Sequence, residues 1–202
     1  MDEARLGVAE VGEGRKANII LGVSGSVAAI KIIELHRRLS DFANIRVVAT
    51  NAAMYFIETT AWQDEIDEIY RDEDEWKSWQ AKGDTVVHID LRKWADAMVI
   101  APLSANTLAK IAHGLCDNLL TCIVRAWDFN KPMLLAPAMN TFMWSSVLTK
   151  RHLGACEDLG GTVIPPISKE LACGDVGQGA MAEPHTIAAE CKQILEKANR
   201  AT

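Results

Sequence analysis

Short, continuously apolar segments recur along the chain, and each predicts a buried β-strand. The five predicted strands are residues 18–24, 45–50, 97–101, 133–136 and 161–164. Between the first two, Ala28, Ile32, Leu35 and Leu39 fall on one face of a predicted helix. Apolar strands that alternate with helices are typical of a parallel sheet covered on both faces. We therefore expect one α/β domain.

The remainder of the chain fits the same plan. Further helices are predicted at residues 104–113, 117–127, 146–159 and from Pro184 onward. Between the fifth strand and the last helix the chain is rich in glycine and proline, and we expect it to be irregular. Residues 1–16 are predicted to form a disordered tail, which leaves residues 17–202 for the domain.

Composition and charge narrow the function classes. The 202 residues are 49% hydrophobic and 24% charged, which is ordinary for a globular protein. The net charge is −6, and no basic stripe is present that could neutralise a nucleic-acid backbone. No apolar run approaches the ~20 residues that span a bilayer, and the first residues do not resemble a secretory signal. We expect a cytoplasmic protein with neither a nucleic acid nor a membrane as partner.

Acidic residues and cysteines add two structural expectations. Residues 58–75 hold nine acids and one base, and we expect a solvated face there. The five cysteines are an odd number without CxxC spacing, which argues against a disulfide framework and against a zinc site. Four of them, Cys116, Cys122, Cys156 and Cys191, fall in helical patterns, where a small buried side chain is the usual role.

Ligands of parallel α/β sheets bind beyond the carboxyl ends of the strands, so the residues after each strand are the candidates for a site. The small residues that follow the first three strands are Gly25, Ser26, Thr50, Asn51, Ser104, Asn106 and Thr107. A tight turn and a capped helix start favour an anion, although a plain helix cap explains each cluster equally well. Taken together on adjacent strands, the clusters predict one pocket for a phosphate and a ring.

The segments after the fourth and fifth strands offer chemistry of a different kind. Met139, Met143 and Trp144 surround Asn140, which indicates either apolar filling or a pocket wall with one amide aimed at a carboxylate. Cys173 stands in a loop with three glycines in six residues, and a thiol in a mobile loop can reach a substrate and retreat. Its alternative is the buried role expected of the other cysteines.

The five histidines divide into two groups. His36, His113, His152 and His185 are predicted at helix surfaces or ends. His88 follows a short apolar run, Thr85-Val86-Val87, and is the candidate for a general base, with a structural histidine as the usual alternative.

Six segments carry specific motifs: 25–31, 87–92, 101–107, 114–120, 137–140 with 143–144, and 172–175 with 179–183. The Pro-Ala-Met-Asn and Ala-Cys-Gly-Asp motifs are the most specific of these. In this order and spacing the motifs resemble those of the phosphopantothenoylcysteine decarboxylases, in the homo-oligomeric flavin-containing cysteine decarboxylase superfamily. The resemblance covers nearly the whole chain from about residue 17.

This resemblance implies a fold, an assembly and a set of roles. The fold would be a single-domain flavodoxin-like, Rossmann-like three-layer sandwich, and the protein a homotrimer with FMN and the active site at subunit interfaces. His88 would be the base and Cys173 the proton donor, while Asn140 would bind the substrate carboxylate and Met143 would line the pocket. The residues implied to bind FMN are Gly25, Ser26, Val27, Thr50, Ser104, Ala105, Asn106, Thr107 and Ala138.

The implied reaction converts (R)-4'-phospho-N-pantothenoylcysteine to 4'-phosphopantetheine and carbon dioxide, a step of coenzyme A synthesis. Direct loss of carbon dioxide would leave an unstabilised carbanion, whereas transient oxidation of the thiol-bearing carbon by the flavin gives a thioaldehyde that accepts the electrons. The enethiolate that remains is then protonated and reduced. The alternatives are a regulatory flavoprotein subunit without decarboxylase activity, a sister enzyme that acts on a peptide C-terminal cysteine, a flavin prenyltransferase and a flavodoxin-like electron carrier.

Overall fold

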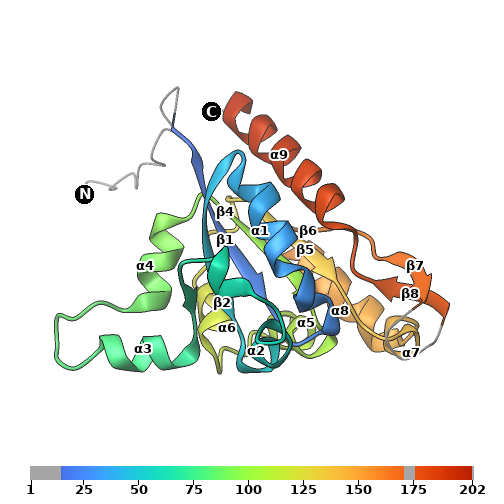
Figure 1. Ribbon diagram of the computed structural model, residues 1–202, viewed down its shortest axis with the longest axis horizontal. Helices are drawn as coiled ribbons and strands as arrows, with labels where there is room; N and C mark the ends of the chain where they lie inside the picture. The colour runs from blue at the N-terminus through green and yellow to red at the C-terminus, as the bar shows by residue number, and fades with distance from the viewer. Residues whose placement is uncertain (1–14, 171–175, 202) are drawn as a thin grey trace, which may run out of the picture.

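The computed structural model describes residues 15–170 and 176–201 of the chain. The strands of its main sheet are β1 (Ala17–Val23), β2 (Ala43–Ala49), β3 (Ile69–Tyr70), β4 (Ala97–Leu103), β5 (Met133–Pro137) and β6 (Gly161–Val163). They pair in parallel in the order β3-β2-β1-β4-β5-β6 (Figure 1). A separate antiparallel hairpin consists of β7 (Ile167–Glu170) and β8 (Val176–Ala180).

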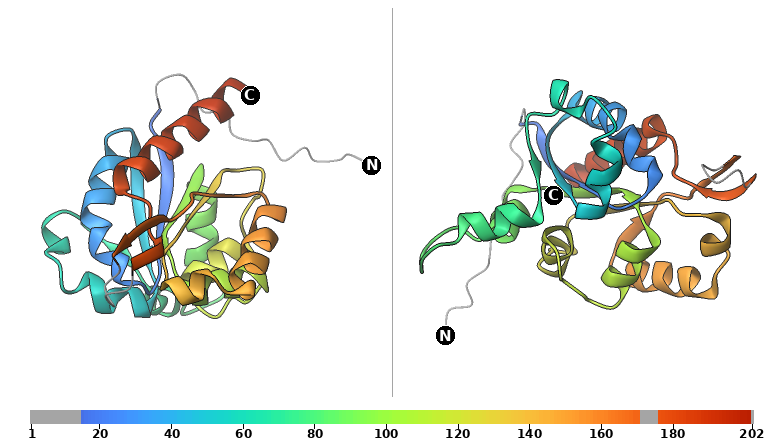
Figure 2. Two further views of the ribbon diagram at one scale, coloured as in Figure 1. Left: turned by 90° about the vertical axis from the view of Figure 1, so that its right-hand side faces the viewer. Right: turned by 60° about the horizontal axis from the view of Figure 1, so that its bottom comes forward.

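Helices cover both faces of the sheet (Figures 1 and 2). The helices are η1 (Val27–Lys31), α1 (Ile32–Ser40), α2 (Asn51–Ile57), η2 (Trp62–Asp64), α3 (Asp72–Ser78), α4 (Val87–Trp94), α5 (Ala105–Ala112), α6 (Leu119–Arg125), α7 (Thr141–Trp144), α8 (Val147–Asp158) and α9 (Pro184–Ala201). One apolar cluster joins the sheet to α1, α2 and α9, and a second joins the opposite face to α4, α5, α6 and α8. The three layers confirm the predicted α/β sandwich.

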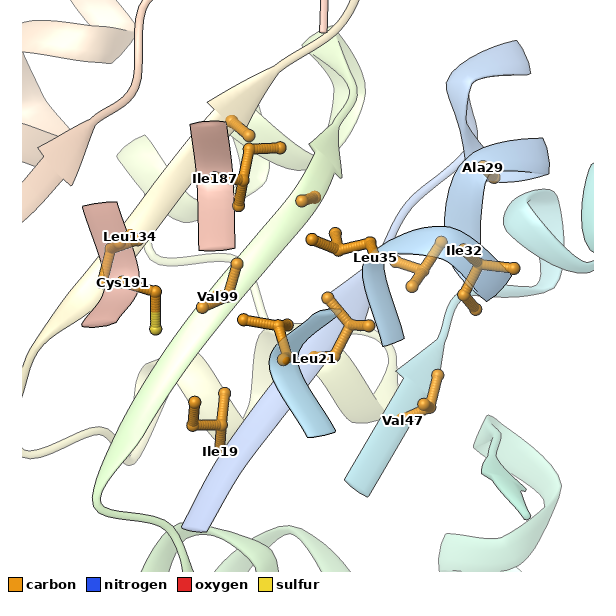
Figure 3. Close-up of a cluster of buried hydrophobic side chains, with 14 of the residues drawn as sticks. Ile19, Leu21, Ala29, Ile32, Leu35, Val47, Val99, Leu134, Ile187 and Cys191 are labelled. Atoms are coloured by element: carbon orange, nitrogen blue, oxygen red, sulfur yellow. The ribbon is translucent and has the colours of Figure 1, made fainter. Parts of the chain in front are cut away.

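Successive apolar side chains of β1 point to opposite faces of the sheet, so each face needs a layer of helices. Ile19 and Leu21 lie in the first cluster and Ile20 in the second, and all three side chains are fully buried. In the first cluster, Figure 3 shows Leu35 of α1 and Ile187 of α9 on the same face of the sheet as Leu21 and Ile19. An apolar strand of this kind is stable only between two helical layers.

All five predicted strands are present, with ends displaced by one or two residues. The sixth strand, β3, was not predicted, because two residues at a sheet edge give no periodic signal. The predicted irregular segment after the fifth strand is wrong in part, because residues 167–170 and 176–180 pair as a hairpin. The glycines of this segment thus do not prevent strand formation.

The ends of the described chain add two facts. Residues 1–14 of the predicted tail lie outside the described residues, and Arg15 donates to both carboxylate oxygens of Asp96 at 2.9 and 2.8 Å. In the part of the chain that the structure describes, no helix is long and apolar enough to cross a membrane.

Gly22, the penultimate residue of β1, lies where the strand packs closely against α6. A Cβ atom there would lie 2.6 Å from Leu120 Cδ1 of α6, so Gly22→Ala requires the helix side chain to move. We expect a loss of about 1–3 kcal/mol in the free energy of unfolding, measured by urea denaturation. The control is Gly154→Ala in α8, where no atom lies within 4 Å of the new Cβ. That change is expected to stabilise by about 0.5–1 kcal/mol, and equal effects of the two substitutions would contradict the prediction.

Candidate active site

The carboxyl ends of β1 and β4 are joined by a buried hydroxyl group. Ser24 Oγ donates to the carbonyl oxygen of Pro102 at 2.8 Å and accepts from the backbone N–H of Ser104 at 2.7 Å. On the other side of β1, the backbone N–H of Thr50 donates to the carbonyl oxygen of Val23 at 3.0 Å. The segments that follow β2, β1 and β4 are therefore held together at one edge of the sheet. Sequence reasoning misses Ser24, because the apolar pattern places it at the end of the first predicted strand and gives no sign of its hydrogen-bond partners.

Each of these three segments begins a helix with a side-chain cap. Ser26 Oγ accepts from the backbone N–H of Ala28 at the start of η1, and Thr50 Oγ1 accepts from that of Ala53 in α2. Ser104 Oγ accepts from the backbone N–H of Thr107 at the start of α5. Helix starts carry partial positive charge and N–H groups without helical partners. The predicted clusters of small donors thus lie on one edge, and the chemistry of this edge suits an anion.

The turn after β1 leaves no room for a side chain at Gly25. A Cβ atom there would lie 2.6 Å from the Cβ of Ala52, in the first turn of α2. The backbone of this turn therefore packs directly against the start of α2. Buried hydroxyl groups at Thr50, Ser104 and Thr107 stand beside it. A bare backbone turn flanked by small hydroxyl groups fits a phosphate monoester with a polyol chain, as in FMN.

The segment after β5 extends this edge. The backbone N–H of Ala138 donates to the carbonyl oxygen of Leu103 at 2.9 Å, which places Ala138 beside the end of β4. Asn140 caps α7, and its Oδ1 accepts from the backbone N–H of Phe142 at 2.8 Å. In α7, Phe142 is 79% exposed and Met143 is 50% exposed. Met143 is therefore exposed on the surface of a single chain. This exposure suits a residue that lines a pocket together with a second molecule.

Hairpin β7–β8 packs directly on this segment. The backbone N–H of Met139 donates to the carbonyl oxygen of Gly179 at 2.9 Å. Gly179 has a φ of +141°, and a Cβ there would overlap the Met139 carbonyl oxygen, while a Cβ on Gly177 would lie 2.7 Å from the side chain of Thr141. These two glycines, which belong to the loop that the sequence predicts to be mobile, are required by close contact with residues 139–141.

Ion pairs hold the base of the hairpin to the first part of the chain. Glu183, just after β8, accepts from Lys31 Nζ of η1 at 2.6 Å and lies 3.6 Å from Lys169 Nζ of β7. The hydrogen bond from Lys31 lowers the pKa of the Glu183 carboxyl. Cys173, the predicted proton donor, belongs to residues 171–175 and lies outside the described residues.

His88 lies in the first turn of α4, and the short apolar run that precedes it leads into this helix without forming a strand. Its Nδ1 is 2.6 Å from Glu75 Oε1, and its backbone N–H donates to Glu75 Oε2 at 3.1 Å. Asp72 of α3 likewise accepts from the backbone N–H of Leu119, at the start of α6, at 2.8 Å. The acidic segment is therefore only partly a solvated face, since two of its carboxylates bind the starts of other helices.

A single chain does not bring all the predicted site residues together. Figure 1 shows α3 and α4 on the left of the molecule and α7 with the hairpin on the right, and the right-hand view of Figure 2 agrees. The residues predicted to bind FMN gather between these two flanks, at the ends of β1, β2, β4 and β5. His88 and Asn140 thus lie on opposite flanks.

The other described cysteines and histidines differ in their burial. Cys156 and Cys191 are buried, as predicted, and burial raises the pKa of the two thiols to about 11 and about 12. Cys116 was predicted to be buried in a helix, but it is exposed, because Gly114 with a φ of +68° ends the turn after α5 before Cys116 is reached. His113 and His152 pack edge to face with ring centroids 4.9 Å apart.

One cavity of about 200 Å³ lies away from the sheet edge, between α5 and α6, and it contains none of the predicted site residues. It is lined mainly by apolar side chains, among them Ile111, Leu115 and Val124, with Arg125 at its side. This cavity is therefore not part of the candidate site, which lies at the carboxyl ends of the strands.

Comparison with known proteins places this chain in a family. The flavoprotein family matches residues 8–196. Phosphopantothenoylcysteine decarboxylase of Oryza sativa subsp. japonica is 60% identical over 172 residues, covering 85% of this chain and 78% of the rice protein. The enzyme of that name from Mus musculus is 49% identical over 187 residues, covering 92% of this chain and 90% of the mouse protein.

Solved structures agree with this placement. A cysteine-to-serine mutant of PPC decarboxylase complexed with pantothenoylaminoethenethiol has a TM-score of 0.86 and 53% identity, covering 90% of this chain and 100% of the other. The FMN-binding protein AtHal3 has a TM-score of 0.82 and 54% identity, covering 91% of this chain and 98% of the other. The chain therefore belongs to the flavoprotein family and, within it, to the phosphopantothenoylcysteine decarboxylases.

Proposed function

We propose that this protein is an FMN-dependent carboxy-lyase that converts (R)-4'-phospho-N-pantothenoylcysteine to 4'-phosphopantetheine in coenzyme A synthesis. The observation that carries the proposal is the edge at which capped helix starts, a bare glycine turn and the Asn140 segment meet. Relatives at 49–60% identity with the decarboxylase name support it more than they support a regulatory subunit without activity.

The strand ends supply the proposed FMN site. The residues that would hold the cofactor are Gly25, Ser26, Val27, Thr50, Ser104, Ala105, Asn106, Thr107 and Ala138. Three of these are buried hydroxyl residues, and in a buried site hydroxyl and N–H groups replace the hydration that a phosphate loses. When bound, FMN supplies a reversible two-electron acceptor for the thiol-bearing carbon of the substrate, which side chains alone cannot provide.

The chain's own groups would bind the substrate and move protons. Asn140 would hold the substrate carboxylate through its amide nitrogen, because its Oδ1 accepts from the backbone N–H of Phe142. Met143 would line the pocket, and His88 would act as the general base. Cys173 would donate the proton that completes the product, and hairpin β7–β8 would shield the reacting groups from water.

Separation of His88 from Asn140 supports an active site shared between subunits, in a homotrimer. The two residues lie on elements at opposite flanks of one chain, and Met143 and Phe142 beside Asn140 are exposed. A neighbouring subunit could present its α4 to this α7 and complete the site. We also propose that residues 17–202 form the flavoprotein domain and that the protein is cytoplasmic, where the four described free cysteines would remain reduced.

Substitution of His88, the proposed general base, is the first test. His88→Asn is expected to retain bound FMN and its absorbance, while the decarboxylation rate falls about 10²–10⁴-fold, the usual contribution of a general base. Product formation from phosphopantothenoylcysteine is followed by mass spectrometry. The control is His113→Asn at an exposed histidine outside the proposed site, with activity near wild type. Full activity of His88→Asn would mean that another group is the base.

Mixed oligomers test the shared site. Purified His88→Asn and Asn140→Asp subunits are each expected to be inactive, the second because a carboxylate repels the substrate carboxylate. After co-refolding, random trimers should recover about one quarter of wild-type activity, because one interface in four combines an intact His88 with an intact Asn140. If each chain carried a complete site, no subunit of the mixture would have both residues and no activity would return.

Cys173→Ser tests the proton donor. The variant is expected to release carbon dioxide and to accumulate the oxidised, enethiol-containing product, because the final protonation fails. Mass spectrometry separates this product from phosphopantetheine by two hydrogens. Cys116→Ser, at the exposed cysteine between α5 and α6, is the control and should give phosphopantetheine. A normal phosphopantetheine yield from Cys173→Ser would remove Cys173 from the mechanism.

A further inference from the structure

Glu75 holds His88 through both of its carboxylate oxygens. Oε1 lies 2.6 Å from the ring Nδ1, and Oε2 accepts from the backbone N–H of the same residue at 3.1 Å. Both side chains are largely buried, with 16% of Glu75 and 25% of His88 exposed. Two contacts between one carboxylate and one residue leave little freedom for either side chain.

The donors and acceptors in this pair admit one arrangement. A backbone N–H can only donate, so Oε2 must accept from it. An ionised carboxylate can only accept, so the hydrogen between Oε1 and Nδ1 belongs to the ring nitrogen. In the neutral imidazole the lone pair then lies on Nε2, the nitrogen turned away from Glu75. A histidine base needs its lone pair on the nitrogen that faces the substrate.

We propose that Glu75 is a positioning residue that fixes His88 in the tautomer with hydrogen on Nδ1 and the lone pair on Nε2. The proposal rests on the proposed function, in which His88 is the general base. Nothing in the sequence marks Glu75 out from the eight other acids of residues 58–75. Only the packing of α3 against α4 brings it to the ring.

Charged and titratable groups around the pair are compatible with this role. From α6, the thiol of Cys122 has its pKa raised to about 11, first by burial and then by nearby groups that include Cys116 and Glu75. That thiol is therefore protonated at neutral pH and adds no charge. From α3 itself, Asp72 is bound to the backbone N–H of Leu119 and does not contact the ring.

A purely structural role for Glu75 is the competing explanation. Its Oε2 binds the first turn of α4, just as Asp72 Oδ1 binds the first residue of α6, and such contacts stabilise helix starts. Substitution by alanine would remove both roles together. A substitution is therefore needed that keeps the helix contact and changes the tautomer.

Glu75→Gln meets this need. The amide has one oxygen, which must accept from the backbone N–H of His88, and the remaining NH₂ group then faces Nδ1 as a donor. The ring can accept that hydrogen bond only with its own hydrogen on Nε2. The substitution therefore keeps the contact with the helix and moves the lone pair to the wrong nitrogen.

The experiment compares Glu75→Gln with wild type and with Asp72→Asn. Asp72→Asn removes the same charge from the same helix, keeps an oxygen for Leu119, and has no contact with His88. Holoenzymes are labelled with ¹⁵N-histidine, and the tautomer is determined by NMR at alkaline pH, where imidazole is neutral. His88→Asn assigns the signal among the five histidines. The kcat, KM, FMN absorbance and Tm are measured alongside.

We expect the Nδ1–H tautomer in wild type and Asp72→Asn, and the Nε2–H tautomer in Glu75→Gln. The kcat of Glu75→Gln should fall about 10²–10⁴-fold, the usual contribution of a general base, because the lone pair then lies on the wrong nitrogen. KM, FMN absorbance and Tm should match those of Asp72→Asn, whose kcat should stay within about threefold of wild type, because the asparagine keeps the oxygen that binds Leu119.

Three results would overturn the proposal: an Nε2–H tautomer in wild type, an unchanged tautomer in Glu75→Gln, or a changed tautomer with kcat near wild type. A lower Tm in Glu75→Gln without a change of tautomer would assign Glu75 a structural role only. The NMR result does not depend on the reaction. If wild type does not decarboxylate phosphopantothenoylcysteine, the proposed function fails, and the tautomers still show whether Glu75 sets the hydrogen position.

Discussion

The buried hydroxyl of Ser24 is the interaction on which the candidate site depends. It donates to the end of β4 at Pro102 and accepts from the start of α5 at Ser104, so one oxygen joins two strands and a helix. A buried hydroxyl must be hydrogen-bonded, and both of its partners are backbone groups of the neighbouring strand segment. The turn at Gly25 and the cap at Ser104 are thereby held in one relative position. That position gives isolated helix starts the geometry of a common anion-binding edge.

A second constraint is the absence of side chains at selected glycines. Gly25 lets the turn after β1 lie against α2, and Gly177 and Gly179 let the hairpin lie against residues 139–141. In each case a Cβ atom would meet an atom of the neighbouring segment. The ion pair between Lys31 and Glu183 then ties the hairpin to the segment that follows β1. The base of the hairpin is therefore held both to the segment after β5 and to the segment after β1.

The acidic segment, residues 58–75, contributes contacts with other helices in addition to its charge. Repulsion among nine acids is relieved where a carboxylate binds a positive helix start, and α3 does this twice, at α4 and α6. The same contact brings Glu75 to the His88 ring. α7, with Phe142 and Met143 exposed, lies on the opposite flank, and a single chain does not unite His88 with Asn140.

The hydrophobic pattern alone determined the order of the strands along the chain, the α/β class and the edge at which small polar residues gather. These features are local or follow from the rule that parallel strands end at one edge. Motif resemblance added the family. Tertiary structure alone decided that Ser24 bridges two strands, that Glu75 rather than a neighbouring acid meets His88, that the glycine-rich segment pairs as a hairpin, and that Cys116 is exposed. Each of these depends on a contact between residues distant in sequence, or on a turn that ends a helix early. The periodicity of apolar residues does not reveal such contacts, because it shows which face of a helix or strand is apolar and not which other element packs on that face.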